Sequence, residues 1–272
     1  MLVLKFFNSP FVPKREFDNL SLLYYDLGFK SGIYRVPRPY FYGNNNECYY
    51  IAEDFVEGED LDHYLERGIL NPLKYYGKLL RKLSQVANWL SNLHSLTYLD
   101  IPSSKDQQLD YMNKLISSLR GWNKFDLFEY RIVDLIDRWK VKIDRADFLF
   151  SSLVHGDATP TNFIIKGDVV YAIDLERMKR QHPLWDVGFI CSEIKHYYMW
   201  KGKSSYDAEP VVSHFFRVYS DSFGRVDFKL LSDYLPFFMA MGYMRISRNT
   251  WLHDDHRMRL LEEAINCLEY GL

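Results

Sequence analysis

Three cysteines in 272 residues are too few for a disulfide framework or a cysteine-rich metal site. Cys48, Cys191 and Cys267 are odd in number and far apart, which is typical of a protein from a reducing cytosol. An excess of one charge is also lacking, because the net charge of −2 gives no basic surface for a nucleic-acid backbone. Long apolar runs are missing too, since the run 235–241 is brief and contains a proline. We therefore expect a cytoplasmic protein that contacts neither nucleic acid nor membrane.

The chain does contain enough apolar residues, 47%, to bury a real core. Residues 2–7 read as a strand, 13–29 as an amphipathic helix, and 34–43 with 47–56 as an antiparallel pair around a GNNN turn. From 60 to 144 nearly everything reads as helix, then 149–175 as an island of strands, and helices follow to the end. We expect a strand-rich N-terminal lobe over 1–56 and a larger helical lobe over 57–272.

Polar residues gather at one end of a predicted hairpin in that island. Two apolar runs flank Gly167-Asp168, which is a hairpin signal. A two-residue loop pairs Asn162 with Ile173, and a three-residue loop pairs it with Asp174; the spacing leaves both registers open. In either register Asn162 and Asp174 meet at the open end of the hairpin, with Asp157 one short turn upstream.

An all-oxygen group of this kind suits Mg²⁺, a hard ion that keeps waters and shares its shell with phosphates. The alternative is that Asp157 and Asn162 only cap turns, as such residues often do. Because the hairpin brings the three side chains together, we favour the metal site.

The motif His155-Gly156-Asp157, followed by Asn162 and then by Asp174-Leu-Glu176, resembles the catalytic segment of the aminoglycoside phosphotransferase and choline kinase family. Three further segments resemble that family in order: its hinge at 53–61, its Leu-His helix end at 90–96 and its Pro-x-x-Asp helix start at 182–188. The resemblance implies an α+β, protein-kinase-like fold of two lobes, with a small antiparallel sheet and a larger helical lobe.

The resemblance also implies an ATP- and Mg-dependent transfer of the γ-phosphate to a hydroxyl of a small molecule. Asp157 would be the catalytic carboxylate that orients the substrate hydroxyl, and Asn162 and Asp174 would hold Mg²⁺ against the phosphates. Lys5 would contact those phosphates and Glu16 would pair with Lys5. In the bland alternative, Lys5 is a solvated residue on an edge strand, and Glu16 only complements a helix dipole.

Adenine would lie against the hinge backbone, from Asp54 to Val56, although this acidic run is also typical of a solvated hinge. His155 and Asp186 are expected to brace the catalytic loop. Glu176 would reach the metal through water or pair with a neighbouring arginine. The helical pair Glu193 and His196 reads as a surface pair, and the HDDH run at 253–256 lacks the companions of a metal site.

The sequence departs from the family at one point. The family normally has a glycine-containing hairpin before the lysine, and no such hairpin precedes Lys5 here. Lys5 stands almost at the first residue, and its strand has apolar residues on both faces, as inside a sheet. We therefore expect an upstream hairpin or another chain to cover that edge. Two rivals stay open, a degenerate kinase-like binding protein without transfer activity and a protein kinase. The substrate also stays open among amino sugars, amino alcohols and simple sugars.

Overall fold

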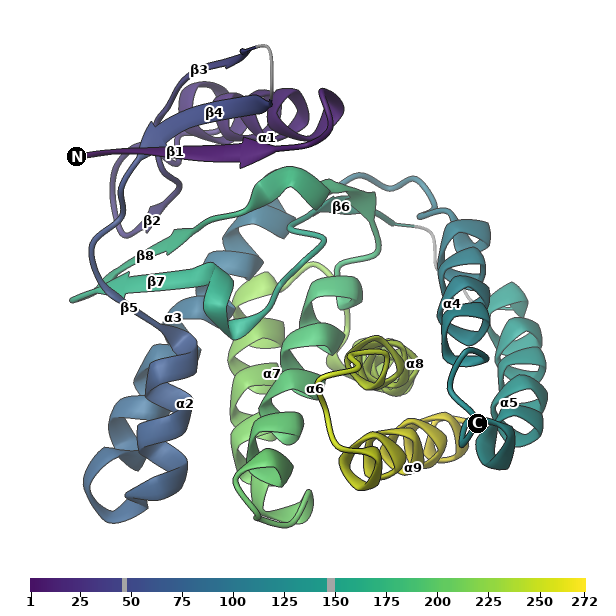
Figure 1. Ribbon diagram of the computed structural model, residues 1–272. Coiled ribbons are helices and arrows are strands. Elements are labelled where there is room, and N and C mark those ends of the chain that lie inside the picture. The colour runs from purple at the N-terminus through teal and green to yellow at the C-terminus, as the bar shows by residue number, and fades with distance from the viewer. Residues whose placement is uncertain (46–47, 146–149) are drawn as a thin grey trace.

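A computed structural model describes residues 1–45, 48–145 and 150–272 of the chain. Figure 1 shows a small part, built on a sheet and one helix, above a larger helical part. The strands are β1 (Leu2–Phe7), β2 (Tyr34–Arg35), β3 (Pro39–Asn44), β4 (Tyr49–Asp54), β5 (Glu59–Asp60), β6 (Ser152–Val154), β7 (Phe163–Lys166), β8 (Val169–Ala172) and β9 (Lys179–Gln181). The helices are α1 (Phe11–Ser21), α2 (Leu61–Leu70), α3 (Pro72–Leu96), α4 (Lys105–Leu119), α5 (Asp126–Arg145), α6 (Leu184–Trp200), α7 (Glu209–Phe223), α8 (Phe228–Ser247) and α9 (Asp254–Tyr270).

The small part is an antiparallel sheet in the order β1-β4-β3, with α1 packed against it. In the part of the chain described here β1 pairs with β4 alone, so the sheet is one partner short at this edge, as the sequence indicates. The strand alternates: Lys5 and Phe7 turn partly inward, whereas Leu4 and Phe6 are 46% and 60% exposed. Cover for this edge by a further hairpin or chain stays a prediction.

A second sheet, in the order β2-β8-β7-β5, contains the predicted hairpin. Strands β7 and β8 pair Phe163 with Ala172 and Lys166 with Val169, so the loop between them has two residues. Gly167 in this loop adopts φ +62, a conformation that glycine reaches without strain. The short strand β5 pairs with β7 and then continues into α2, whose first turn is capped by the Asp60 side chain. The second sheet therefore links the small part to the helical part.

The helical part is built around α6 and α8, which are buried along most of their length. Helices α7 and α9 pack against this pair, α3 packs against α7, and α4 and α5 lie at the side in Figure 1. The core is rich in large side chains, and Trp89, Trp139 and Trp185 are almost fully buried. Among the described residues, none of the helices has both the length and the apolar character needed to span a bilayer.

Two element predictions need correction. The helix predicted over 13–29 begins at Phe11, and its end is a π-helical turn from Leu22 to Asp26. The island 149–175 is not all strand, because residues 155–159 form a loop and Pro160–Asn162 form a 3₁₀ turn between β6 and β7. Residues 146–149 lie outside the described part of the chain.

Candidate active site

The first turn of α6 holds the loop that follows β6 through the side chain of Asp186. The Asp186 carboxylate accepts the backbone N–H of His155 at 2.6 Å and that of Gly156 at 2.9 Å. It also lies 3.1 Å from Nε2 of His94, at the end of α3. All three side chains of this group, Asp186, His94 and His155, are fully buried. Buried polar groups of this kind are stable when every member is hydrogen-bonded, so the loop has a fixed shape.

His155 has the neutral form in this loop. Its Nδ1 accepts the backbone N–H of Asp157, and its Nε2 therefore donates to the Ile173 carbonyl at 3.0 Å. Burial lowers the pKa of His155, which favours this neutral imidazole. Gly156 adopts φ +83, and a Cβ at this position would collide with the Arg177 carbonyl. The imidazole thus joins the loop to the hairpin, and the glycine permits their close approach.

The hairpin brings Asn162 and Asp174 to one end, as the spacing predicts. The two-residue loop makes Asn162 the partner of Ile173, whose N–H donates to the Asn162 carbonyl at 3.0 Å. The Asn162 amide donates to the Asp157 carbonyl at 2.9 Å. Asp174 is the residue with a positive φ, +58, among the described residues other than glycine. Such a conformation is uncommon for aspartate and turns its side chain out of the hairpin, where it is about half exposed.

Lys5 connects the small part of the molecule to this hairpin. Its Nζ lies 2.5 Å from Oδ1 of Asp174, 2.7 Å from Oε1 of Glu16 on α1 and 2.9 Å from Oε1 of Glu53 on β4. Asn19 of the same helix donates to the Leu175 carbonyl at 2.7 Å, which gives α1 a second contact with the segment after Asp174. The predicted pair of Lys5 and Glu16 is therefore present in the geometry.

One ammonium balances three carboxylates here. Burial raises the pKa of Glu16 to about 7 and also raises that of Glu53, against the opposing effect of Lys5. Burial by itself lowers the pKa of Lys5, but the carboxylates of Glu16, Glu53 and Asp174 outweigh it and raise that pKa overall. The cluster thus keeps Lys5 charged and retains more negative than positive charge.

The residues suit a magnesium ion. With Asn162 Nδ2 and Asp174 Oδ1 engaged, Asn162 Oδ1 and Asp174 Oδ2 have no hydrogen-bond donor among the described residues. No group of three or more His, Cys, Asp or Glu residues able to hold a metal ion occurs in that part of the chain. A site with two protein oxygens fits Mg²⁺, which usually binds through one or two carboxylates, waters and phosphates.

Asp157 is flanked by two arginines that the sequence did not reveal. Arg245, from α8, donates to Oδ1 of Asp157, and Nε of Arg177 lies 3.7 Å from Oδ2. The Asp157 side chain is 20% exposed and that of Arg245 is 14% exposed. The carboxylate predicted to be catalytic therefore faces a partly open, cationic environment.

The predicted hinge offers one backbone position to a ligand. The Asp54 N–H donates to the Arg38 carbonyl and the Phe55 N–H to the Met1 carbonyl, both at 3.0 Å. Among the described residues, the Val56 N–H and C=O have no hydrogen-bond partner. Of the predicted hinge residues, Val56 is thus the one whose backbone is free to meet a base.

The other motifs do not join the site as metal ligands. His196 is buried and the Glu193 side chain is only 13% exposed, so the prediction of a surface pair is wrong. Glu193 lies 3.8 Å from Arg245, and His196 bonds to His256 at 2.9 Å. The side chains of the 253–256 run do not form a metal site. Asp254 pairs with Lys124 at 3.1 Å. Glu176 faces Arg177 at 3.5 Å.

Glu53 and Arg245 escaped the sequence analysis, and Arg177 was expected as a partner of Glu176 but not of Asp157. Glu53 had a usable signal, since Val3 pairs with Glu53 and a diagonal neighbour of Lys5 on the same face is expected to touch it. For Arg245 the signal was weaker: it is one cation at the end of the apolar run of α8.

The chain is similar to a family of phosphotransferases in sequence and to solved kinases in fold. The model of the phosphotransferase enzyme family matches residues 2–220. No curated protein matches the chain in sequence. A glucosamine kinase solved with glucosamine, ADP and inorganic phosphate is similar in structure, with a TM-score of 0.62 and 14% identity over 99% of this chain and 76% of that one.

Two further solved structures agree. Choline kinase from Cryptosporidium parvum Iowa II gives a TM-score of 0.62 at 12% identity, over 99% of this chain and 82% of that one. The ternary complex of streptomycin, ATP and APH(2")-IIa gives 0.57 at 15% identity, over 97% and 84% of the two chains. These likenesses confirm the kinase-like α+β fold of two lobes. The chain thus belongs to the phosphotransferase enzyme family.

Proposed function

We propose that this protein transfers the γ-phosphate of ATP to a hydroxyl group of a small molecule. The observation that carries the proposal is the contact of Lys5 with Asp174, 169 residues apart in the chain, next to the loop of Asp157. This contact unites a phosphate-binding cation, a metal-binding carboxylate and a carboxylate able to orient a hydroxyl. Phosphoryl transfer needs positioning and charge neutralisation more than covalent chemistry, and these residues supply both.

Each residue has a distinct part in the proposal. Asp157 accepts the hydrogen bond of the acceptor hydroxyl and aligns its oxygen with the phosphate. Asn162 and Asp174 hold Mg²⁺, which when bound neutralises phosphate charge. Lys5, kept charged and oriented by Glu16, contacts the phosphates. The adenine lies against the hinge from Asp54 to Val56.

The proposal also includes the division into lobes and the location of the protein. We propose that the lobes divide between residues 56 and 57, at the hinge that precedes β5. The described cysteines are all free, which supports a reducing compartment and a cytoplasmic location.

The test combines binding with turnover. Mg·ATP should raise the melting temperature of the protein more than ATP with a chelator does, because the metal bridges Asp174 to the phosphates. ADP release should then depend on an added hydroxyl compound from a panel of sugars, amino sugars, amino alcohols and hydroxy acids. A Mg·ATP melting shift without ADP release for any acceptor would favour a binding protein that lacks transfer activity.

A further inference from the structure

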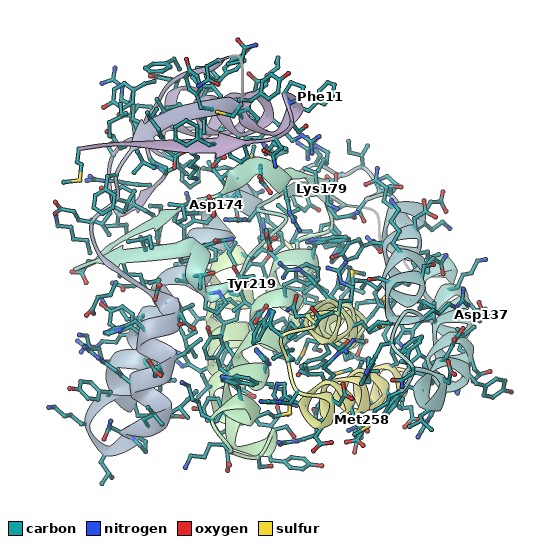
Figure 2. The ribbon with its side chains drawn as sticks, viewed as in Figure 1. Phe11, Asp137, Asp174, Lys179, Tyr219 and Met258 are labelled. Atoms are coloured by element: carbon teal, nitrogen blue, oxygen red, sulfur yellow. The ribbon has the colours of Figure 1, made fainter. Side chains whose placement is uncertain are left out.

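Three cationic side chains lie at Asp157 or next to its loop. Arg245 and Arg177 contact the two carboxylate oxygens, and Lys179 belongs to the strand that pairs with β6, directly opposite Val154. Figure 2 labels Lys179 and Asp174 at the level where the small sheet meets the helical part. The proposed roles of Lys5, Asn162 and Asp174 give these three cations no task.

Lys179 is half-buried and has no carboxylate within ion-pairing distance among the described residues. Its Nζ lies 3.5 Å from the centre of the Trp185 ring, and the Trp185 indole N–H points at the Gly156 carbonyl at 3.4 Å. The ammonium therefore stacks on a buried ring directly beside the loop. Burial, opposed by Asp186 and helped by Lys114 and Arg177, lowers the pKa of Lys179 to about 8. A desolvated ammonium without a counterion is costly, so an anionic partner is missing from this position.

The position of Arg245 also carries a desolvation cost. It ends an apolar helix, is 14% exposed, and lies over the Phe189 ring with 5.1 Å between the guanidinium carbon and the ring centre. A partly buried guanidinium has five donors to satisfy, and Asp157 with Glu193 engage only part of them. Its helix also lies beyond residue 220, where the family match ends. We take α8, which carries Arg245, as the part of the chain in which acceptor specificity differs from that of other family members.

Of the three cations, Lys179 is the one without an ion pair among the described residues. Asp157, Glu176 and Glu193 lie within ion-pairing distance of the two arginines, whereas Asp186 acts on Lys179 only from farther away. Burial raises the pKa of Glu193 to about 7, so this carboxyl is only about half ionised near neutral pH. A cationic acceptor would have to approach Asp157 past Arg177, Lys179 and Arg245, and their repulsion opposes its binding.

We infer that the acceptor carries a carboxylate or a phosphate besides the hydroxyl that is phosphorylated, and that Lys179 and Arg245 bind this oxyanion. The inference rests on the proposed phosphotransferase function. Arginine can bind an oxyanion with two parallel hydrogen bonds, and lysine adds a point charge from the other side. An oxyanion that engages Arg245 also frees an oxygen of Asp157 for the hydroxyl proton. Lys179 and Arg245 thus select the acceptor, whereas Lys5 and Asp174 bind the nucleotide and its metal.

The test measures acceptor binding with the nucleotide site filled. The protein is saturated with Mg²⁺ and the non-hydrolysable analogue AMP-PNP, and its melting temperature is recorded with two matched series. The first is glycerate, glycerol 3-phosphate, glycerol and ethanolamine; the second is gluconate, glucose 6-phosphate, glucose and glucosamine. We expect the oxyanions to raise the melting temperature and the neutral or cationic members to leave it unchanged. The carboxylates and phosphates within each series show which oxyanion is preferred.

Two variants identify the residues. Lys179→Met keeps the length of the side chain and removes a desolvated charge, so it should fold, and Arg245→Gln keeps a hydrogen-bonding head group. Each should weaken oxyanion binding by about tenfold, the size of one charge-assisted contact, and leave the AMP-PNP shift unchanged. Lys229→Met, on an exposed turn of α8, serves as the matched control and should change neither shift.

The outcomes separate this inference from the proposed function. A normal AMP-PNP shift with no response to any oxyanion, or a response to glucosamine and ethanolamine alone, would overturn the inference and leave nucleotide binding intact. A loss of the AMP-PNP shift in both variants would also overturn it, because the cations would then serve the transferred phosphate. Failure of the wild type to respond to Mg·AMP-PNP counts against the proposed function itself.

Discussion

The Asp186 carboxylate binds the backbone of Gly156 across 30 residues of sequence, with Oδ1 accepting the glycine N–H at 2.9 Å. Its other oxygen accepts the His155 N–H, so a single buried side chain fixes two successive peptide groups. Asp157 is the next residue. Its direction therefore depends on a carboxylate that takes no part in the proposed chemistry.

Asp186→Asn should reduce both stability and transfer activity. The amide has one oxygen, so its NH₂ group would face one of the two backbone donors, and a buried hydrogen bond to a charged group would be lost. We expect a loss of about 2–3 kcal/mol in the free energy of unfolding, measured by urea denaturation. Asp221→Asn, on an exposed turn of α7, is the control and should change stability little. Equal stability of the two variants would contradict this bracing role.

Asp157→Asn should remove transfer and spare the fold. The amide keeps the shape of the side chain but accepts the hydroxyl proton poorly, so we expect kcat to fall by at least about a hundredfold. The Mg·ATP melting shift should persist, because the nucleotide is held by other residues. ADP release with the best acceptor of the panel is the measurement. Residual activity within about tenfold of wild type, about 1.4 kcal/mol of barrier, would mean that another group orients the hydroxyl.

Asp174→Ala should abolish the magnesium-dependent part of the ATP melting shift, since this side chain has a free oxygen toward the site. Asn162→Ala should weaken the magnesium-dependent shift, because it removes the second oxygen that faces the metal. It also removes the hydrogen bond from the Asn162 amide to the Asp157 carbonyl. The comparison is made with Mg²⁺ and with a chelator at equal ATP concentration. Asp168→Ala, in the turn of the same hairpin, tests whether damage to the hairpin alone has this effect. An undiminished shift in Asp174→Ala would place the metal elsewhere.

The local part of the site was predictable from sequence. Gly167-Asp168 between two apolar runs gives a hairpin, and the side chains at its open end follow from counting residues on each strand. Of the two registers that the spacing left open, the structure has the two-residue loop, with Asn162 opposite Ile173. Such counting succeeds because strand pairing is rigid over a few residues.

The long-range part was not predictable in this way. Arg245 meets Asp157 across 88 residues, and this contact depends on how α8 crosses α6, which no local pattern encodes. The cover of the β1 edge is also beyond local patterns, because Leu4 and Phe6 stay exposed beside a single partner strand among the described residues. The family resemblance supplied the pairing of Lys5 with Glu16, which spacing alone does not give.

A buried histidine pair makes stability depend on pH on the acid side. His196 on α6 and His256 on α9 share a hydrogen bond of 2.9 Å between Nδ1 and Nε2. Burial, with a smaller contribution from His256, lowers the pKa of His196 to about 3. Burial also lowers the pKa of His256 to about 4, with Arg259 and His253 acting in the same direction. Both rings are therefore neutral in the folded protein at pH 6.

In the unfolded chain both histidines titrate near pH 6.5, so below this pH the unfolded state binds more protons than the folded state. The contribution of the pair is thus complete above pH 6.5 and is lost as the pH falls toward 4. We expect His256→Gln to reduce the slope of stability against pH in this window by about 1.4 kcal/mol per pH unit, the value for one proton. Urea unfolding at four pH values from 4.5 to 7.5 measures the slope. His253→Gln, at an exposed position, should change the slope far less, because His253 is only a minor cause of the low pKa of His256. Equal slopes for all three proteins would show that the pair does not bind protons on unfolding.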